Sequence, residues 1–218
     1  MKQNLTKMNN YPNYSDKETQ LEYYIDNGCV RQANENFYGA IFCFTKALEI
    51  SPKHAEAYLR RGIVRGILKD FTGAISDFSK AIVLNPNYTD AYFNRGLLWY
   101  RSGIYINALE DFLRVTDINP NYSGVYILIA DVYWKDKNYA HAVKYYSQAI
   151  EVEPGNMSAY YKRAHAKRVL MDYDGALDDF NKFIMLNPNV GQITLTKAIK
   201  KLFKKEIKEA HFSFSSLN

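Results

Sequence analysis

Apolar and small residues recur along most of the chain with helical spacing, in stretches of about 14 residues separated by short polar turns. Each pair of stretches is followed by a proline, which ends a helix and starts a turn. These prolines are spaced 34 residues apart without insertion or deletion, at Pro52, Pro86, Pro120, Pro154 and Pro188. The pattern predicts five helix–turn–helix repeats, at 21–54, 55–88, 89–122, 123–156 and 157–190, after a flexible segment at 1–20.

Aligning the five repeats shows which of their 34 positions keep one kind of side chain. Position 20 is alanine (Ala40, Ala74, Ala108, Ala142, Ala176), position 8 is glycine or alanine (Gly28, Gly62, Gly96, Ala130, Ala164), and position 24 is aromatic (Phe44, Phe78, Phe112, Tyr146, Phe180). Small residues allow two helix backbones to approach closely, and aromatic rings fill the space around that contact. One such hairpin cannot bury its apolar face alone, so the repeats are expected to stack into one elongated core.

At these positions the chain resembles the tetratricopeptide-repeat family, over about 170 of its 218 residues. The resemblance implies an all-α fold, an α-solenoid in the form of a right-handed superhelix, and binding of proteins or peptides without catalysis. Position 11 departs from the family pattern, because Arg31, Arg65 and Lys167 stand where an aromatic residue is usual. We expect these long side chains to pack their methylene stems and to send the charge outward.

A pair of charged positions varies together between the repeats. Position 7 is arginine and position 23 is aspartate in the second, third and fifth repeats: Arg61 with Asp77, Arg95 with Asp111, and Arg163 with Asp179. The first and fourth repeats carry no charge at either position. We therefore predict a partly buried Arg–Asp bridge between the two helices of each charged repeat, with shared descent of the repeats as the alternative explanation.

The resemblance also implies that the first helix of each repeat lines a concave groove, to which positions 2, 5, 6, 9, 12 and 13 contribute. The predicted partner-binding residues are Arg60, Phe93, Asn94, Leu97, Tyr100, Arg101, Ile127, Asp131, Trp134, Lys135, Tyr161, Lys162, His165 and Arg168. The centre of the whole groove is apolar and aromatic. Acidic groups lie toward its N-terminal end (Glu22, Asp26, Glu56, Asp90) and basic groups toward its C-terminal end (Arg101, Lys135, Lys162, Arg168). Such aromatic residues serve as anchors when a partner buries them. The alternative is that they pack against neighbouring helices or form a solvated wall.

One binding mode of the family is missing from this pattern. Family members that hold the C-terminal carboxylate of a chaperone use lysine, asparagine and arginine at positions 2, 5, 6 and 9 of three successive repeats. Asn94 is the only asparagine at position 6. The repeat before it has Leu59 and Ile63 at positions 5 and 9, and the repeat after it has Gly124 and Leu128 at positions 2 and 6. The cations that would bind a carboxylate are absent, so we predict no such clamp.

The net charge of +5 lies mostly at the C-terminus. Residues 191–218 hold six lysines and two glutamates, a local +4, so the remaining 190 residues carry only +1. Leu195, Ile199, Leu202 and Phe203 lie on one side of an amphipathic helix, which we predict caps the last repeat. The alternative is that this basic helix binds an anionic membrane or nucleic acid. A second alternative for the whole chain is self-association, so a homo-oligomer is possible.

The sequence offers little that points to catalysis or to a cofactor. The four histidines are scattered, with His54 in a turn between repeats, His141 on a second helix and His165 in the groove. No phosphate-binding loop, nucleophile elbow or metal-binding motif is present. We therefore expect no enzyme activity, metal, cofactor or small-molecule substrate, and neither nucleic acid nor membrane as the main partner. Cys29 and Cys43 form no disulfide framework, and no secretory leader is recognisable, so we expect a cytoplasmic protein.

Overall fold

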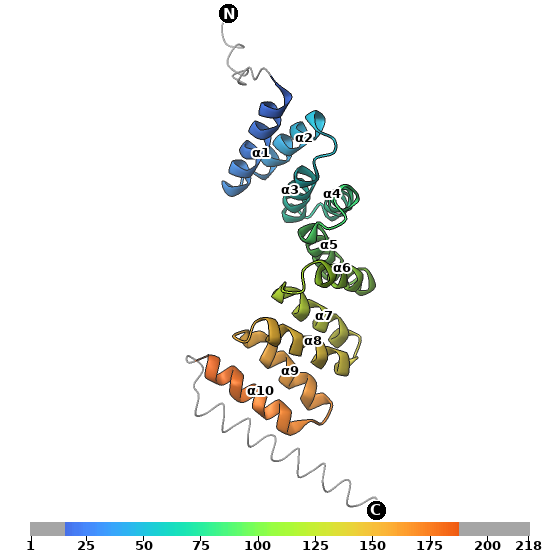
Figure 1. Cartoon of the computed structure of the whole chain (residues 1–218), viewed down its shortest axis with the longest axis vertical. Coiled ribbons are helices and arrows are strands. Elements are labelled where there is room, and N and C mark those ends of the chain that lie inside the picture. The colour runs from blue at the N-terminus through green and yellow to red at the C-terminus, as the bar shows by residue number, and fades with distance from the viewer. Residues whose placement is uncertain (1–15, 188–218) are drawn as a thin grey trace, which may run out of the picture. The chain divides into compact units, whose positions relative to one another are not determined.

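The computed structural model describes residues 16–187, and these residues form ten α-helices and no strand. Figure 1 shows the helices in chain order, and they are α1 (Lys17–Ala33), α2 (Phe37–Ile50), α3 (Ala55–Ile67), α4 (Phe71–Leu84), α5 (Thr89–Arg101), α6 (Tyr105–Ile118), α7 (Ser123–Lys135), α8 (Tyr139–Val152), α9 (Met157–Val169) and α10 (Tyr173–Leu186). Each repeat supplies one pair of helices, and every second helix ends two residues before its proline. The predicted all-α solenoid of paired helices is confirmed.

The helices belong to two compact units, one that ends at Leu98 and one that begins at Trp99. In the N-terminal unit α2 packs against α1 and α3, and α3 packs against α4. In the C-terminal unit α7 packs against α6 and α8, and α9 packs against α8 and α10. The predicted capping helix within 191–218 lies outside the described residues. Helix α1 begins at Lys17, inside the segment predicted to be flexible, because the Asp16 carboxylate accepts hydrogen bonds from the amides of Glu18 and Thr19.

The turn inside each repeat has a conformation that the residue pattern did not reveal. Position 15 has a positive φ in all five repeats, at Glu35, Lys69, Gly103, Lys137 and Met171. Only one of the five is glycine, the residue that adopts this conformation without strain. In four repeats an asparagine or aspartate follows and accepts a hydrogen bond from the backbone three residues on, so it caps the second helix. The cap and the following helix hold the turn in place.

The two helices of a repeat meet where the small residue at position 8 lies under the ring at position 24. A Cβ atom added to Gly28 would lie 2.5 Å from the ring of Phe44, and one added to Gly62 would lie 2.7 Å from the ring of Phe78. The alanines at position 20 are fully buried beside these rings. The predicted role of the small residues, close approach of the helices, is therefore confirmed at these two positions.

The Arg–Asp bridge is present in the second and fifth repeats. The Arg61 guanidinium donates to both carboxylate oxygens of Asp77, at 2.9 and 2.8 Å, and Arg163 binds Asp179 in the same forked manner. Both aspartates are buried, so these are inter-helix pairs with little solvent around the acid. The prediction is confirmed for these two repeats, and the Arg95–Asp111 bridge stays a prediction.

In these two repeats the basic residue at position 11 belongs to the same network, which corrects the expectation that its charge is sent outward, while Arg31 of the first repeat donates to the Asn27 side chain. Arg65 Nη1 lies 2.7 Å from Asp77 Oδ2, and Lys167 Nζ lies 2.9 Å from Asp179 Oδ2. Asp77 and Asp179 therefore each face two cations, from positions 7 and 11 of their own repeats. A buried carboxylate needs such partners, because leaving it unpaired costs several kcal/mol.

The arginine at position 7 also joins its repeat to the one before. Arg61, Arg95 and Arg163 each donate to a hydroxyl at position 25 of the preceding repeat, at Thr45, Ser79 and Ser147, over 2.9–3.1 Å. Each guanidinium also lies over the tyrosine at position 4 of its own helix, 5.6–5.8 Å from the ring centre. This side chain thus combines an ion pair or hydrogen bond with a cation–π contact.

We expect Asp77→Asn to destabilise the chain by about 2–3 kcal/mol, because Arg61 loses its carboxylate partner and Arg65 keeps only the longer contact to Asp70, at 3.6 Å. Urea unfolding followed by far-UV circular dichroism measures the change. The control is Glu49→Gln, which breaks the exposed Lys46–Glu49 pair and should change stability by less than about 0.5 kcal/mol. Equal effects of the two variants would contradict a special role for the buried pair.

Two glycines of α3 provide a matched test of the close helix contact. Gly62→Ala should destabilise the chain by about 1–2 kcal/mol, because the added Cβ collides with the buried Phe78 ring. Gly66→Ala should be neutral or stabilising by up to about 1 kcal/mol, because its nearest neighbour would lie at 3.8 Å and alanine favours the helix. Thermal unfolding of both variants checks the opposite signs. A stabilising Gly62→Ala would show that the ring moves aside without cost.

Candidate functional site

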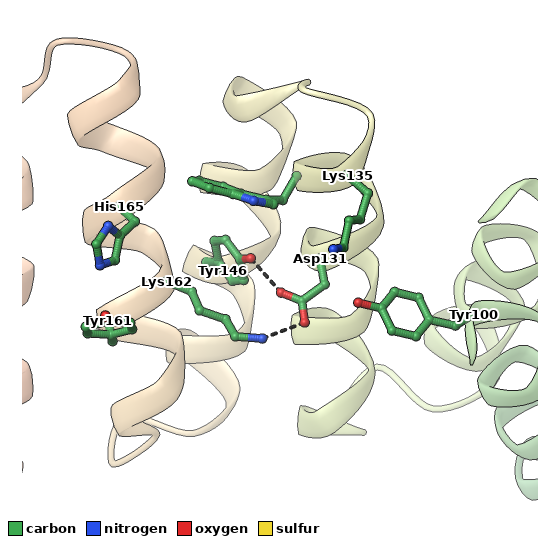
Figure 2. A pocket seen from close by; sticks show the side chains of 8 residues that line it. Tyr100, Asp131, Lys135, Tyr146, Tyr161, Lys162 and His165 are labelled. Atoms are coloured by element: carbon green, nitrogen blue, oxygen red, sulfur yellow. Dashed lines mark hydrogen bonds and ion pairs between the residues drawn. The ribbon is translucent and has the colours of Figure 1, made fainter. Parts of the chain in front are cut away.

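The C-terminal unit contains a cavity of about 420 Å³ between residues of α5, α7, α8 and α9. Figure 2 shows the side chains that line it, which are Tyr100, Asp131, Trp134, Lys135, Tyr146, Tyr161, Lys162 and His165. The first helices α7 and α9 contribute six of these eight residues. The volume lies within the range of ordinary ligand pockets, and aromatic side chains form most of the lining.

The carboxylate of Asp131 is the centre of the polar part of the pocket. The Tyr146 hydroxyl donates to Asp131 Oδ1 at 2.6 Å, and the Lys162 ammonium donates to Oδ2 at 2.5 Å. The Tyr100 hydroxyl points toward the same carboxylate from the end of α5 (Figure 2). Lys162 belongs to the repeat after Asp131, so this ion pair joins α7 to α9 across the pocket. The network therefore fixes the spacing of the two helices that line the site.

Burial and the Asp131 charge keep the nearby tyrosines protonated. Burial and the hydrogen bond to Asp131 raise the pKa of Tyr146 far above its ordinary value. Burial, followed by the charge of Asp131, also raises the pKa of Tyr100. Both hydroxyl groups remain hydrogen-bond donors at neutral pH. Neither is poised to act as a general base, which requires a pKa near the working pH.

Aromatic rings form the two side walls of the pocket. On α7 the indole of Trp134 packs edge-on against Tyr139, with ring centres 5.0 Å apart. On α9 the ring of Tyr161 contacts His165 at 4.6 Å and Phe183 at 5.2 Å. Tyr161 is 45% exposed, so much of its surface is open to a ligand. These contacts hold the rings in one orientation, which lowers the entropy lost when a partner packs on them.

His165 is uncharged at neutral pH because its environment disfavours the imidazolium form. Partial burial lowers the pKa of His165, and the positive charge of Arg168, one turn further along α9, lowers it again. The ring also lies edge-on to Phe180, at 5.2 Å. His165 therefore acts as part of an aromatic wall rather than as a charged group.

The lysines give the pocket a positive balance. Asp131 is the one carboxylate in the lining, whereas Lys135 and Lys162 are two ammonium groups. Lys162 is engaged with Asp131, and Lys135 is exposed and makes no ion pair with any residue of the described segment 16–187. An incoming group meets one unneutralised cation beside the aromatic walls.

The structure brings together seven of the predicted groove residues: Tyr100, Asp131, Trp134, Lys135, Tyr161, Lys162 and His165. Tyr146 was not predicted, because position 24 belongs to the helix contact. The signal that could have identified it is its hydroxyl, which the phenylalanines at the same position of the other repeats lack. Arg101 and Arg168 are exposed at the ends of α5 and α9 and do not line the cavity.

The other predicted groove residues have local partners. In the N-terminal unit Arg60 pairs with Glu56 at 2.6 Å, and the Asn94 side chain donates to the Asp90 carbonyl of its own helix. Phe93 and Leu97 are partly buried on α5. In the C-terminal unit Ile127 packs against the core around Ala130 and Tyr146. For Ile127 packing against neighbours, the alternative interpretation, is the one observed.

Comparisons with known proteins agree with the fold of paired helices. Residues 67–103 match the family described as TPR repeat, and residues 123–156 match the family described as tetratricopeptide repeat. With the five helix pairs, these matches identify the chain as a tetratricopeptide-repeat protein. Such repeats form protein-interaction scaffolds, and this general class of function applies to the chain. Curated protein sequences give no significant match.

Solved structures of low sequence identity share the fold. A crystal structure of MamA protein is 23% identical, with a TM-score of 0.72 over 78% of this chain and 93% of that one. MamA from Desulfovibrio magneticus RS-1 is 18% identical, with a TM-score of 0.72 over 79% and 97% of the two chains. YrrB, described as a TPR protein with an unusual peptide-binding site, is 19% identical, with a TM-score of 0.68 over 84% and 97%.

Two further observations concern only the segment 16–187. None of its helices has the length and apolar character needed to cross a membrane. It also contains no cluster of three or more histidine, cysteine, aspartate or glutamate side chains suited to hold a metal ion. The groups that the lining itself offers to a ligand are its aromatic rings, two lysines, one carboxylate and the His165 imidazole.

The altered pKa of His165 predicts a pH dependence. The folded chain holds this pKa below the ordinary value of 6.5, so the unfolded chain binds more protons as the pH falls. The stability from the neutral imidazole is fully present above pH 6.5 and is lost as the pH falls through the folded value. Titration of the His165 imidazole by NMR should give a midpoint below 6.5, and Arg168→Gln should raise it. Lys182→Gln on α10 is the control, and a midpoint at or above 6.5 would contradict the assignment.

Proposed function

We propose that this chain is a non-catalytic scaffold that binds a segment of a partner protein in the groove between α7 and α9. The main support is the pocket itself, which has the volume of a ligand site and is lined by residues at the groove positions of two successive repeats. Aromatic residues in such a recess are the usual anchors of protein interfaces. The proposal includes no small-molecule substrate, cofactor or nucleic acid.

The polar groups of the pocket support a binding role more than a catalytic one. Both oxygens of Asp131 already accept hydrogen bonds, and the raised pKa of Tyr146 keeps its proton in place. A nucleophile needs a neighbouring base or a lowered pKa, and neither accompanies these groups. We therefore assign the Asp131 network to linking α7, α8 and α9 beside the pocket.

The binding mode proposed here does not use a carboxylate clamp. The positions that would hold a chain terminus carry Leu59, Ile63, Gly124 and Leu128, which cannot donate charge-assisted hydrogen bonds. A partner is instead held along its length, by its side chains. The free C-terminus of a partner is then dispensable, in contrast to the chaperone-binding members of the family.

Replacing the pocket aromatics tests this proposal. Trp134→Ala with Tyr161→Ala should weaken a partner captured from the native host by about 30-fold or more in Kd, because anchors of this kind contribute about 2 kcal/mol or more. The captured protein is purified and titrated against both chains by calorimetry. Circular dichroism confirms that the variant is folded.

Tyr38→Ala is the matched control, because it removes an aromatic ring that is 79% exposed on α2, outside the pocket. It should leave the affinity unchanged. A partner that loses affinity equally with Tyr38→Ala, or that keeps its affinity when the pocket aromatics are removed, would contradict the proposed site. Binding that is lost only on deletion of 191–218 would favour the basic C-terminal segment instead.

A further inference from the structure

We propose that the pocket selects an acidic side chain, aspartate or glutamate, next to an aromatic or large aliphatic residue within a partner segment. This inference rests on the proposed function and specifies the chemistry of its ligand. The partner's carboxylate lies beside the Lys135 ammonium and close to Lys162, while the neighbouring apolar side chain packs on Trp134 and Tyr161. The pocket thereby recognises two adjacent residues of the partner, one acidic and one apolar.

The preference for an acidic side chain follows from the charge balance of the lining. Asp131 is neutralised by Lys162 at 2.5 Å, which leaves the Lys135 ammonium as an uncompensated charge in the site. His165 adds no charge at neutral pH, because burial and Arg168 lower its pKa. The nearby Arg168 strengthens the positive potential at that end of α9. A carboxylate entering the pocket is therefore attracted, and complementary charge is what determines partner choice at such a surface.

A cationic ligand is the main competing possibility, because aromatic rings bind cations well. Two observations oppose it here. Both oxygens of Asp131 already accept hydrogen bonds, from Tyr146 and Lys162. The carboxylate therefore has little acceptor capacity left for an incoming cation. A lysine or arginine of the partner would also approach two ammonium groups of like charge, which disfavours binding.

The preference for a neighbouring apolar side chain follows from the exposed surface of the aromatic walls. Tyr161 is 45% exposed, and Trp134 is partly buried at the edge of the core around Ala130. Both rings pack against neighbouring aromatic residues, Trp134 against Tyr139 and Tyr161 against Phe183. A large apolar side chain that covers them removes apolar surface from solvent at about 25 cal/mol per Å². A carboxylate alone would leave this surface uncovered.

The lining also favours a side-chain carboxylate over a chain terminus. Proteins that hold a terminal carboxylate surround it with several directional donors, such as asparagine amides or a forked guanidinium. The lining contains no asparagine, glutamine or arginine, and its cations are lysines, which act as point charges. A partner segment can therefore enter at any place along its length.

The test uses the full chain and a displayed library of random 12-residue segments that are joined to the carrier at both ends. Enriched sequences are synthesised with acetylated and amidated termini and titrated by fluorescence anisotropy. We expect enrichment of an acidic residue next to an aromatic or large aliphatic one. Replacing that acid by lysine in the peptide should weaken binding by about 10-fold or more, and replacement by glutamine by about 3- to 10-fold.

Variants of the chain give changes of opposite sign. Lys135→Gln should weaken the binding of the acidic peptide by about 3- to 10-fold in Kd. Asp131→Asn keeps an acceptor for Tyr146 but releases Lys162, so it should strengthen binding by about 2- to 5-fold. Lys182→Gln on α10 removes the same charge outside the pocket and should have no effect. If Asp131→Asn does not fold, the replacements of the acidic residue in the peptide, measured with the unaltered chain, still test the preference for an acid.

The outcomes separate the two proposals. Peptides that lose binding with Trp134→Ala but show no preference for an acid, or prefer a basic residue, would overturn this inference and leave the groove function in place. Peptides that bind only with a free C-terminal carboxylate would overturn it as well. A library that yields no binder, or binders unaffected by Trp134→Ala, would overturn both proposals.

Discussion

The structure depends on one steric constraint, the contact between a residue without a large side chain at position 8 and a ring at position 24. A Cβ atom on Gly28 or Gly62 would lie within 2.7 Å of the opposing ring, and the alanines beside those rings have no exposed surface. This close approach fixes the angle and the distance between the helices of one repeat. It also fixes which residues remain on the other side of the first helix. Part of the groove follows from this constraint, because positions 6, 9 and 13 turn away from the neighbour that position 8 faces, whereas positions 5 and 12, three and four residues from position 8, lie next to that contact.

The polar contacts vary around this constant core, and the fourth repeat differs most. In the second and fifth repeats a buried aspartate at position 23 faces cations at positions 7 and 11. The fourth repeat has Ile129 at position 7, and Tyr133 stacks on Tyr145 with ring centres 5.4 Å apart. Its acid is at position 9 instead, as Asp131, which faces the pocket. The ion pair of this repeat thus joins α7 to the next first helix and shapes the binding site, while aromatic stacking replaces it between the paired helices.

The repeat period was sufficient to predict the helix pairs and most of the candidate site. Both follow from helical geometry, since spacing along a helix determines the side on which a residue lies. The turn at position 15 was not predictable, because its left-handed conformation is adopted by lysine, glutamate and methionine as well as by glycine. The side-chain conformations at position 11 were also not predictable from the sequence. Arg65 and Lys167 turn toward a buried aspartate rather than toward water, because the unpaired acid would be costly, and that cost depends on a burial that only the packed structure reveals.

In the proposed binding mode, packing also gives the site a selectivity beyond a general preference for apolar side chains. An aromatic recess alone would accept many apolar side chains, because dispersion and hydrophobic contacts are not directional. The Asp131 network adds a fixed arrangement of charge at the base of that recess, held by Tyr146 from α8 and by Lys162 from α9. Because Lys162 already neutralises Asp131, the net field in the pocket is set by Lys135, a side chain with no ion-pair partner in the described segment 16–187. In the proposed binding mode, discrimination between partners rests on this exposed charge next to oriented rings, so substitutions at Lys135 are expected to change the ligand without disturbing the core.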